Sequence, residues 1–196
     1  MTAFSDLVVY DAEIQRLIPD RDEPRDNKYQ YCQGWTDWLG MGVACVVAYL
    51  CAEKQFRVYM GDNLREFGKL AQSRLMVGFN IEGFDNKLLE AHGVTIPNHW
   101  DLMPNARMAL GEPREYTRGI TKAGRKVDDY ARVNLKLRKS GLGANAPKLW
   151  QDGKIGTLIN YTLDDVYCEL GLIKLCPTLI DPVTMQSFVV KVPWLP

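Results

Sequence analysis

The apolar positions of the chain fall into short runs that predict a sheet with a hydrophobic N-terminal strand at its centre. Residues 7–14 begin with four apolar or aromatic side chains, which is typical of a strand buried on both faces. The stretches 39–51 and 55–60 are separated by a short turn, so we expect them to pair as an antiparallel hairpin. Further short strands are expected at 75–78, at 100–102 and, as an edge strand, at 186–192.

Apolar residues that recur with a helical period predict the helices. These are expected at 62–73, 81–91, a stretch ending near 110, a stretch starting at 128, 147–151 and 153–175, with a break at 141–143. Asp62 and Asn80 stand where they can cap the first two helices. The segments 15–33 and 112–127 are polar and lack such a period, so we expect a long loop and a flexible excursion there.

The composition is that of a folded domain without overall charge. Of 196 residues, 46% are hydrophobic and 24% are charged, and the net charge is zero. We therefore expect a single domain over 1–196, with 177–196 as its C-terminal tail, and no tight sequence-blind binding of nucleic acid through a global field. Residues 114–139 carry nine Lys or Arg against three acids. This basic stretch fits either a solvated surface or a flap that contacts phosphates.

The cysteines and the apolar runs indicate a cellular compartment. Five cysteines, an odd number with no CxxC pair, predict neither a disulfide framework nor a zinc site. Such cysteines are typical of reduced, mostly buried thiols in a cytosolic protein. The N-terminus has no charged-then-apolar leader, and the apolar run 41–52 is too short to span a bilayer. We expect a cytoplasmic protein that does not enter a membrane.

Two acids stand side by side on the first predicted strand. Asp11 and Glu13 are two positions apart, so their side chains project from the same face of a strand. Neighbouring carboxylates that lose water repel each other, and a divalent cation is their natural partner. If the strand instead ends at Tyr10, both acids are solvated in a loop.

Two more acids fall on predicted helix faces that point toward the sheet. Asp85 lies within the apolar stripe of its helix, and Tyr161 and Asp165 are one turn apart on the last long helix. A tyrosine hydroxyl beside a buried carboxylate can hold a water next to a bound metal. Asp164 points away and is expected to be solvated. Taken singly, these fragments are also compatible with an exposed Asp85 and a core tyrosine.

In combination the three fragments resemble a known family of enzymes. The D-x-E of residues 11–13, the run Gly78-Phe79-Asn80-Ile81-Glu82-Gly83-Phe84-Asp85 and the Tyr161-x-x-x-Asp165 of the late helix match the DEDD superfamily of 3′–5′ exonucleases in order and spacing. The tyrosine indicates the DEDDy branch, and the chain is similar to the proofreading domain of family B DNA polymerases. The chain departs from the family at Ile14, where members often carry threonine.

The resemblance implies a fold, a cofactor and a reaction. The fold is α/β and RNase-H-like, with a central mixed sheet, an antiparallel hairpin plus parallel strands, flanked by helices. The implied ligands of two divalent ions, Mg²⁺ or Mn²⁺, are Asp11 as the bridging ligand, Glu13, Asp85 and Asp165. Tyr161 would orient the attacking water, and Asn80 would contact the scissile nucleotide or brace the site. The implied reaction is two-metal hydrolysis of phosphodiester bonds at the 3′ end of DNA or RNA.

Several alternatives stay open at this point. The same fold also supports an RNase-H-like endonuclease, or a catalytically silent nucleic-acid-binding module. The implied substrate is a nucleic acid with a single-stranded 3′ end, and a polymerase or another replication protein is a candidate partner. The aromatic residues of the first loop and its flank either stack on a single-stranded end or belong to the core: Tyr29, Tyr31, Trp35 and Trp38.

Overall fold

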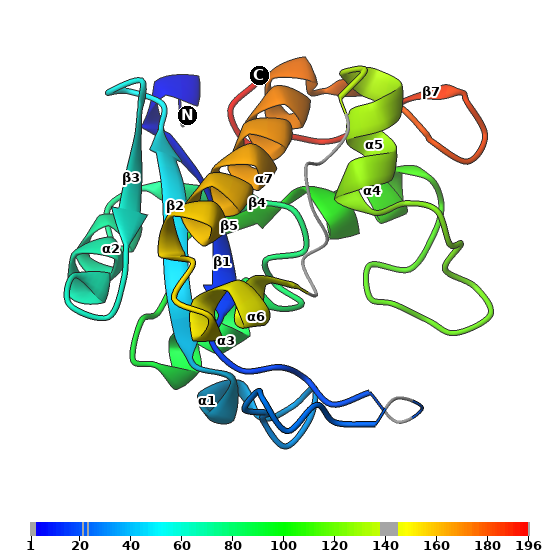
Figure 1. Cartoon of the computed structure of the whole chain (residues 1–196). Coiled ribbons are helices and arrows are strands. Elements are labelled where there is room, and N and C mark those ends of the chain that lie inside the picture. Colours follow the sequence, from blue (N-terminus) through cyan, green and yellow to red (C-terminus); the bar gives the residue numbers. More distant parts are fainter. Residues whose placement is uncertain (1–2, 21, 23, 138–144, 196) are drawn as a thin grey trace.

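A five-stranded sheet forms the centre of the molecule. The computed structural model describes residues 3–20, 22, 24–137 and 145–195, and the expected break at 141–143 lies outside them. The strands of the sheet are β1 (Leu7–Ile14), β2 (Val43–Leu50), β3 (Gln55–Tyr59), β4 (Leu75–Gly78) and β5 (His99–Asp101). Their order is β3-β2-β1-β4-β5 (Figure 1). β1 pairs antiparallel with β2 and parallel with β4, so the sheet is mixed.

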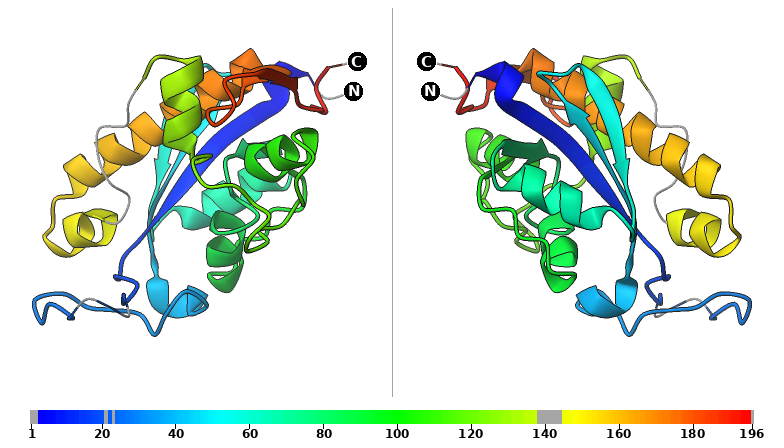
Figure 2. Two further views of the ribbon diagram at one scale, coloured as in Figure 1. Left: turned by 90° about the vertical axis from the view of Figure 1, so that its right-hand side faces the viewer. Right: turned by 90° about the vertical axis from the view of Figure 1, so that its left-hand side faces the viewer.

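Helices cover both faces of this sheet, which confirms the expected RNase-H-like fold. They are α1 (Trp38–Met41), α2 (Leu64–Ala71), α3 (Asp85–Ala91), α4 (Leu102–Ala109), α5 (Val127–Asn134), α6 (Ala146–Gln151) and α7 (Ile155–Leu175), preceded by a short 3₁₀ turn, η1 (Phe4–Asp6). α7 crosses one face, and α2 and α3 lie on the other (Figures 1 and 2). Among the described residues, no helix has both the length and the apolar character needed to cross a bilayer.

The side chains of β1 alternate between two hydrophobic layers. Leu7 and Val9 pack in the layer that contains residues of α7, while Val8 and Tyr10 pack in the layer that contains residues of α2 and α3. This alternation is the ordinary consequence of strand geometry. The same alternation directs the next odd-numbered residues, Asp11 and Glu13, toward α7.

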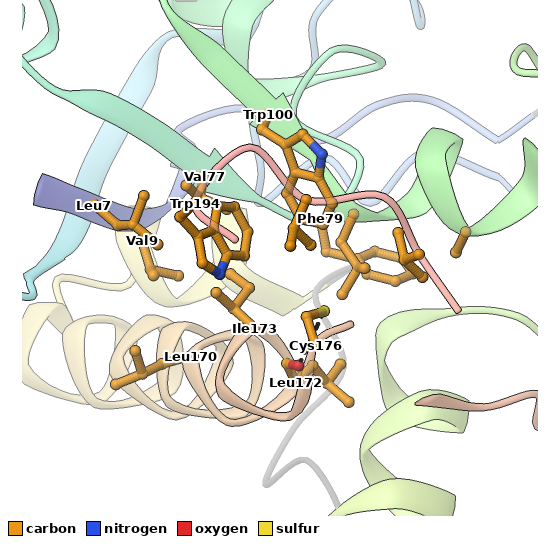
Figure 3. Packing of buried hydrophobic residues seen from close by; sticks show 14 of the residues in the cluster. Leu7, Val9, Val77, Phe79, Trp100, Leu170, Leu172, Ile173, Cys176 and Trp194 are labelled. Atoms are coloured by element: carbon orange, nitrogen blue, oxygen red, sulfur yellow. Dashed lines mark hydrogen bonds between the residues drawn. The ribbon is translucent and has the colours of Figure 1, made fainter. Parts of the chain in front are cut away.

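The C-terminal residues close the layer on the α7 side. Figure 3 shows Trp194 beside Trp100, above the apolar residues of α7, and the two indole rings lie 4.9 Å apart in an edge-on arrangement. The strands β6 (Thr178–Ile180) and β7 (Ser187–Val189) pair with each other in a separate two-stranded sheet. The edge strand expected at 186–192 is therefore shorter than predicted, and it does not join the central sheet because β6 takes it as a partner.

Most predicted elements are confirmed to within about two residues, but the predicted strand 39–51 begins too early. Its first residues form α1, which starts after Asp37. The Asp37 side chain accepts a hydrogen bond from the Gly40 N–H, and Gly42 then turns the chain with a φ of +67°. A side-chain cap and a left-handed residue separate a helical turn from the strand, although both stretches are apolar.

Candidate metal centre

The first two acids lie on β1 just beyond the point where its parallel partner ends. β4 pairs with Leu7–Val9, whereas β2 pairs with β1 as far as Ile14. The alternative in which the strand ends at Tyr10 is therefore wrong. Asp11 is half-buried and Glu13 is 9% exposed. Both carboxylates are thus held on rigid backbone at the carboxyl end of the neighbouring parallel strand.

α7 brings a third carboxylate to this place. Asp165 is 3% exposed on the face of α7 that packs on the sheet, and Asp164 is exposed as expected. Carboxylate oxygens of Asp11, Glu13 and Asp165 all lie within 4.8 Å of one another. Three acids from two elements far apart in the sequence therefore form one cluster.

Asp85 lies next to this cluster, where it is hydrogen-bonded to the backbone of β1. It is 4% exposed, and its Oδ1 accepts a hydrogen bond from the Ala12 N–H at 2.9 Å. Burial, and secondly the negative charge of Asp11, raise the pKa of Asp85 well above its ordinary value. Asp85 is therefore buried beside a like charge, an arrangement that a cation would relieve.

The backbone around Asp85 differs from the prediction. The helix expected at 81–91 begins only at Asp85, so Asn80 does not cap it. Instead the buried Asp101 carboxylate accepts hydrogen bonds from the N–H groups of Asn80 at 2.7 Å and Glu82 at 2.9 Å. Asn80 itself adopts a left-handed conformation with a φ of +68°. These bonds hold residues 80–82 in turns, and the helix starts four residues later than predicted, at Asp85.

Tyr161 lies one turn before Asp165 on α7 and is 8% exposed. Burial, followed by the charges of Asp165 and Glu13 and by a hydrogen bond with Asp165, raises the pKa of its hydroxyl well above the ordinary value. The hydroxyl consequently keeps its proton at neutral pH. Its ring packs in a small apolar cluster with Leu158 and Cys45, so part of the side chain belongs to the core, as the alternative interpretation allows.

All six residues singled out in the sequence line one cleft of about 940 Å³: Asp11, Glu13, Asn80, Asp85, Tyr161 and Asp165. The cleft also contains an acid that the sequence did not reveal. Glu169 is 3% exposed and follows Asp165 by one turn of α7. Its Oε2 lies 3.4 Å from the position of a Cβ on Gly78, at the end of β4. The repeat of acids at i and i+4 was the available signal.

Basic side chains line another part of the same cleft. They are Arg107, Lys122, Arg125, Lys126 and Lys148. Arg125 is buried and binds Asp181 through Nε and Nη2, at 2.7 Å each, and Glu112 through Nη1. Part of the basic stretch 114–139 therefore lines the cleft, and Arg125 ties the excursion 112–127 to the β6–β7 hairpin.

The donor set of the cluster fits a hard divalent cation. Carboxylate oxygens are the ligands that Mg²⁺ and Mn²⁺ prefer, and three of them converge within 4.8 Å. Sulfur and imidazole ligands are not part of this group among the described residues. The acidic group can therefore hold metal ions, and a cation would offset the repulsion that burial imposes on these side chains.

Comparisons with known proteins identify a similar fold but no similar sequence. No protein-family profile and no curated protein sequence matches the chain. The chain is similar in structure to the family B DNA polymerase of the hyperthermophilic archaeon Pyrobaculum calidifontis, with a TM-score of 0.57 and 17% identity. The alignment covers 86% of this chain but only 24% of that polymerase. At this level of identity the similarity shows a shared fold, found within a much longer enzyme that acts on nucleic acid.

Proposed function

We propose that the chain is a metal-dependent 3′–5′ exonuclease of the DEDDy type, related to the proofreading domains of family B DNA polymerases. The observation that carries this proposal is the convergence of Asp11, Glu13 and Asp165 within 4.8 Å. Asp85 hydrogen-bonded to β1 and Tyr161 in the same cleft support it. The motif order in the sequence and the fold shared with a family B polymerase point to the same enzyme class.

In this proposal Asp11, Glu13, Asp85 and Asp165 would hold two divalent ions, Mg²⁺ or Mn²⁺. Bound ions of this kind supply an activated water and stabilise the leaving 3′ oxygen of an in-line phosphoryl displacement. The protonated hydroxyl of Tyr161 orients the attacking water. Asn80 contacts the terminal nucleotide, and Lys122 and Lys126 contact phosphates further along the strand.

We also propose that residues 1–196 work as one exonuclease domain. Described residues of the loop 15–33 and of the excursion 112–127 line the cleft, and Asp181 of the C-terminal tail supports the excursion through its ion pair with Arg125. The five cysteines are free and buried, which suits the reducing cytoplasm. A polymerase or another replication protein is the partner class that this proposal suggests.

The proposal is tested with a 5′-labelled single strand incubated with Mn²⁺ or Mg²⁺. An exonuclease that starts at the 3′ end produces a ladder of progressively shorter labelled products, and it leaves a circular single strand intact. An RNase-H-like endonuclease would instead open the circle. A silent binding module would retain the strand without shortening it. Either of these two results, obtained with protein that binds Mn²⁺, would contradict the proposal.

A further inference from the structure

Trp35 is a large aromatic side chain that is not packed in the hydrophobic core. It is 67% exposed and lines the cleft that contains the acids. The other aromatics of this region have partners: Trp38 packs on Phe84 at 5.5 Å, and Tyr29 and Tyr31 each lie under a cationic side chain. Among the described residues, no ring or cation contact involves Trp35. Of the two alternatives for these aromatics, the core alternative is therefore wrong for Trp35, whereas Trp38 packs against a core cluster.

The backbone that carries Trp35 is firmly held. The Asp37 carboxylate accepts hydrogen bonds from the N–H groups of Gln33 at 2.7 Å and Gly40 at 3.0 Å, and the Asp37 N–H donates to the Gly34 carbonyl at 3.1 Å. Trp35 stands within the turn that these bonds close. Its exposure is thus a property of a defined turn, whose two ends are fixed by one side chain.

Both ends of the loop are also fastened to the helix beside the cleft. The Gln151 side chain of α6 donates to the carbonyls of Gln15 and Gln30 at 2.9 and 3.1 Å and accepts from the Gln30 N–H at 2.6 Å. Lys28 pairs with Asp152 at 2.8 Å just beyond the same helix. These contacts span both arms of the loop and fix its position relative to α6, and hence to the cleft that α6 helps to line.

We infer that Trp35 is a stacking platform for an unpaired nucleobase of the strand whose 3′ end occupies the acidic cluster. This inference rests on the proposed function and names a residue that determines how the strand is held. A flat indole surface at the edge of a cleft that also presents Lys122, Lys126 and Lys148 matches a ligand with alternating bases and phosphates. Stacking of this kind is tolerant of sequence, because every base has an aromatic face.

The chain offers a matched control for this inference. Leu39 is 68% exposed on α1, four residues from Trp35, and is not among the described residues that line the cleft. Trp35→Ala and Leu39→Ala each remove an exposed apolar side chain from the same segment. Neither side chain is buried, so both variants should fold, and Trp35→Phe keeps an aromatic face at the critical position.

The test measures binding without hydrolysis. Fluorescence anisotropy in EDTA gives the Kd of a 5′-labelled oligothymidylate for the wild type and the three variants. We expect Trp35→Ala to weaken binding by roughly 5- to 150-fold, Trp35→Phe to recover most of the loss, and Leu39→Ala to change Kd less than about twofold. A set of oligonucleotides, each with one abasic residue near the 3′ end, locates the base that stacks on Trp35. At one position of the abasic residue, the wild type should bind the abasic strand more weakly than the intact strand. Trp35→Ala should bind these two strands equally well.

The outcomes separate this inference from the proposed function. If Trp35→Ala binds as Leu39→Ala does while the wild type shortens strands with Mn²⁺, the stacking platform is wrong and the exonuclease proposal stands. If Trp35→Ala loses affinity but no strand is ever shortened, the platform is supported and the exonuclease proposal fails. If the wild type neither binds an oligonucleotide in EDTA nor shortens a strand with Mn²⁺, both are overturned. If it shortens strands with Mn²⁺ but binds none in EDTA, the platform is wrong, because a stacking contact needs no metal.

Discussion

The carboxylate of Asp85 accepts a hydrogen bond from the backbone N–H of Ala12 at 2.9 Å. Ala12 separates the two acids of the first strand, so this bond attaches the second motif directly to the first. It also gives the N–H a partner at the point where β4 has stopped pairing with β1. Asp85 is therefore held beside the other acids by the backbone of β1, although their charges repel one another.

The stability of the metal-free protein should depend on the charge of Asp85. Its pKa is raised in the folded state by burial and by Asp11, so the folded state holds this proton to a higher pH than the unfolded chain does. Stability in EDTA should consequently fall as pH rises from about 4 toward neutrality. Asp85→Asn keeps an oxygen for the Ala12 N–H and removes the charge. It should raise the free energy of unfolding at pH 8 by about 0.5–2 kcal/mol.

Urea denaturation of the wild type and Asp85→Asn at pH 5 and pH 8 checks this prediction. The gain should be larger at pH 8, and saturating Mn²⁺ should reverse it by stabilising the wild type more than the variant. A variant that is less stable than the wild type at pH 8 in EDTA would show that Asp85 is not under electrostatic strain.

Asp165 and Asp164 form a natural pair of test and control. Asp165→Asn removes a carboxylate from the cluster, whereas Asp164→Asn changes its exposed neighbour on the same helix. We expect Asp165→Asn to lower the rate of strand shortening by about 100-fold or more, because several kcal/mol of charge stabilisation depend on the metal ligands. Asp164→Asn should stay within about twofold. Equal rates for the two variants would mean that the cluster is not the reaction site.

Tyr161→Phe removes only the hydroxyl group and so tests its role. The ring continues to pack against Leu158 and Cys45, so folding and metal affinity should be retained. Without the hydroxyl the attacking water is misplaced, and kcat should fall by about 100-fold while KM changes little. Calorimetric titration with Mn²⁺ provides the second readout. A variant that loses metal binding together with kcat would give Tyr161 a structural role instead.

The buried ion pair of Arg125 and Asp181 should support the excursion that lines the cleft. Asp181→Asn removes the negative charge beside the buried guanidinium and replaces one of the two oxygens that accept from it, and it should lower the free energy of unfolding by about 3 kcal/mol. Glu66→Gln, which breaks the exposed pair with Lys69, should cost less than about 1 kcal/mol.

The same pair sets a dependence on acid. The hydrogen bonds from Arg125 hold the pKa of Asp181 well below its usual range. Its contribution to stability is therefore complete above the unfolded pKa of about 3.9 and is lost as pH falls below that value. The stabilities of the wild type and Asp181→Asn, measured by urea denaturation, should converge in strong acid. A constant difference between pH 7 and pH 2 would show that the effect of the substitution is not electrostatic.

Local patterns were sufficient to find the acids on regular elements. Asp11 and Glu13 follow from strand alternation, and Tyr161 and Asp165 follow from helical spacing, because both periods fix the direction of a side chain. The start of α3 did not follow, because it depends on Asp101, a carboxylate about twenty residues further along that captures two N–H groups of the preceding turn. Tertiary contacts of this kind leave no trace in a local pattern.

Two other features also lie beyond local patterns. Glu169 recurs one turn after Asp165, but acids at this spacing are common on solvated helices, and this one is buried where α7 packs near Gly78 at the end of β4. Arg125 belongs to a basic stretch that resembles ordinary surface, and its burial depends on Asp181 from a distant hairpin. In both cases the side chain is buried by an element that is distant in the sequence, and local spacing does not predict where that element lies.

Crystals of the protein soaked in Mn²⁺ and measured near the manganese absorption edge test the central claim most directly. The account predicts anomalous density between the carboxylates of Asp11, Glu13 and Asp165, at the metal–oxygen distances of roughly 2.0–2.2 Å typical of such small hard cations, and none there in crystals of Asp165→Asn. If saturating Mn²⁺ leaves this position empty, or binds only elsewhere in the crystal, the account is contradicted.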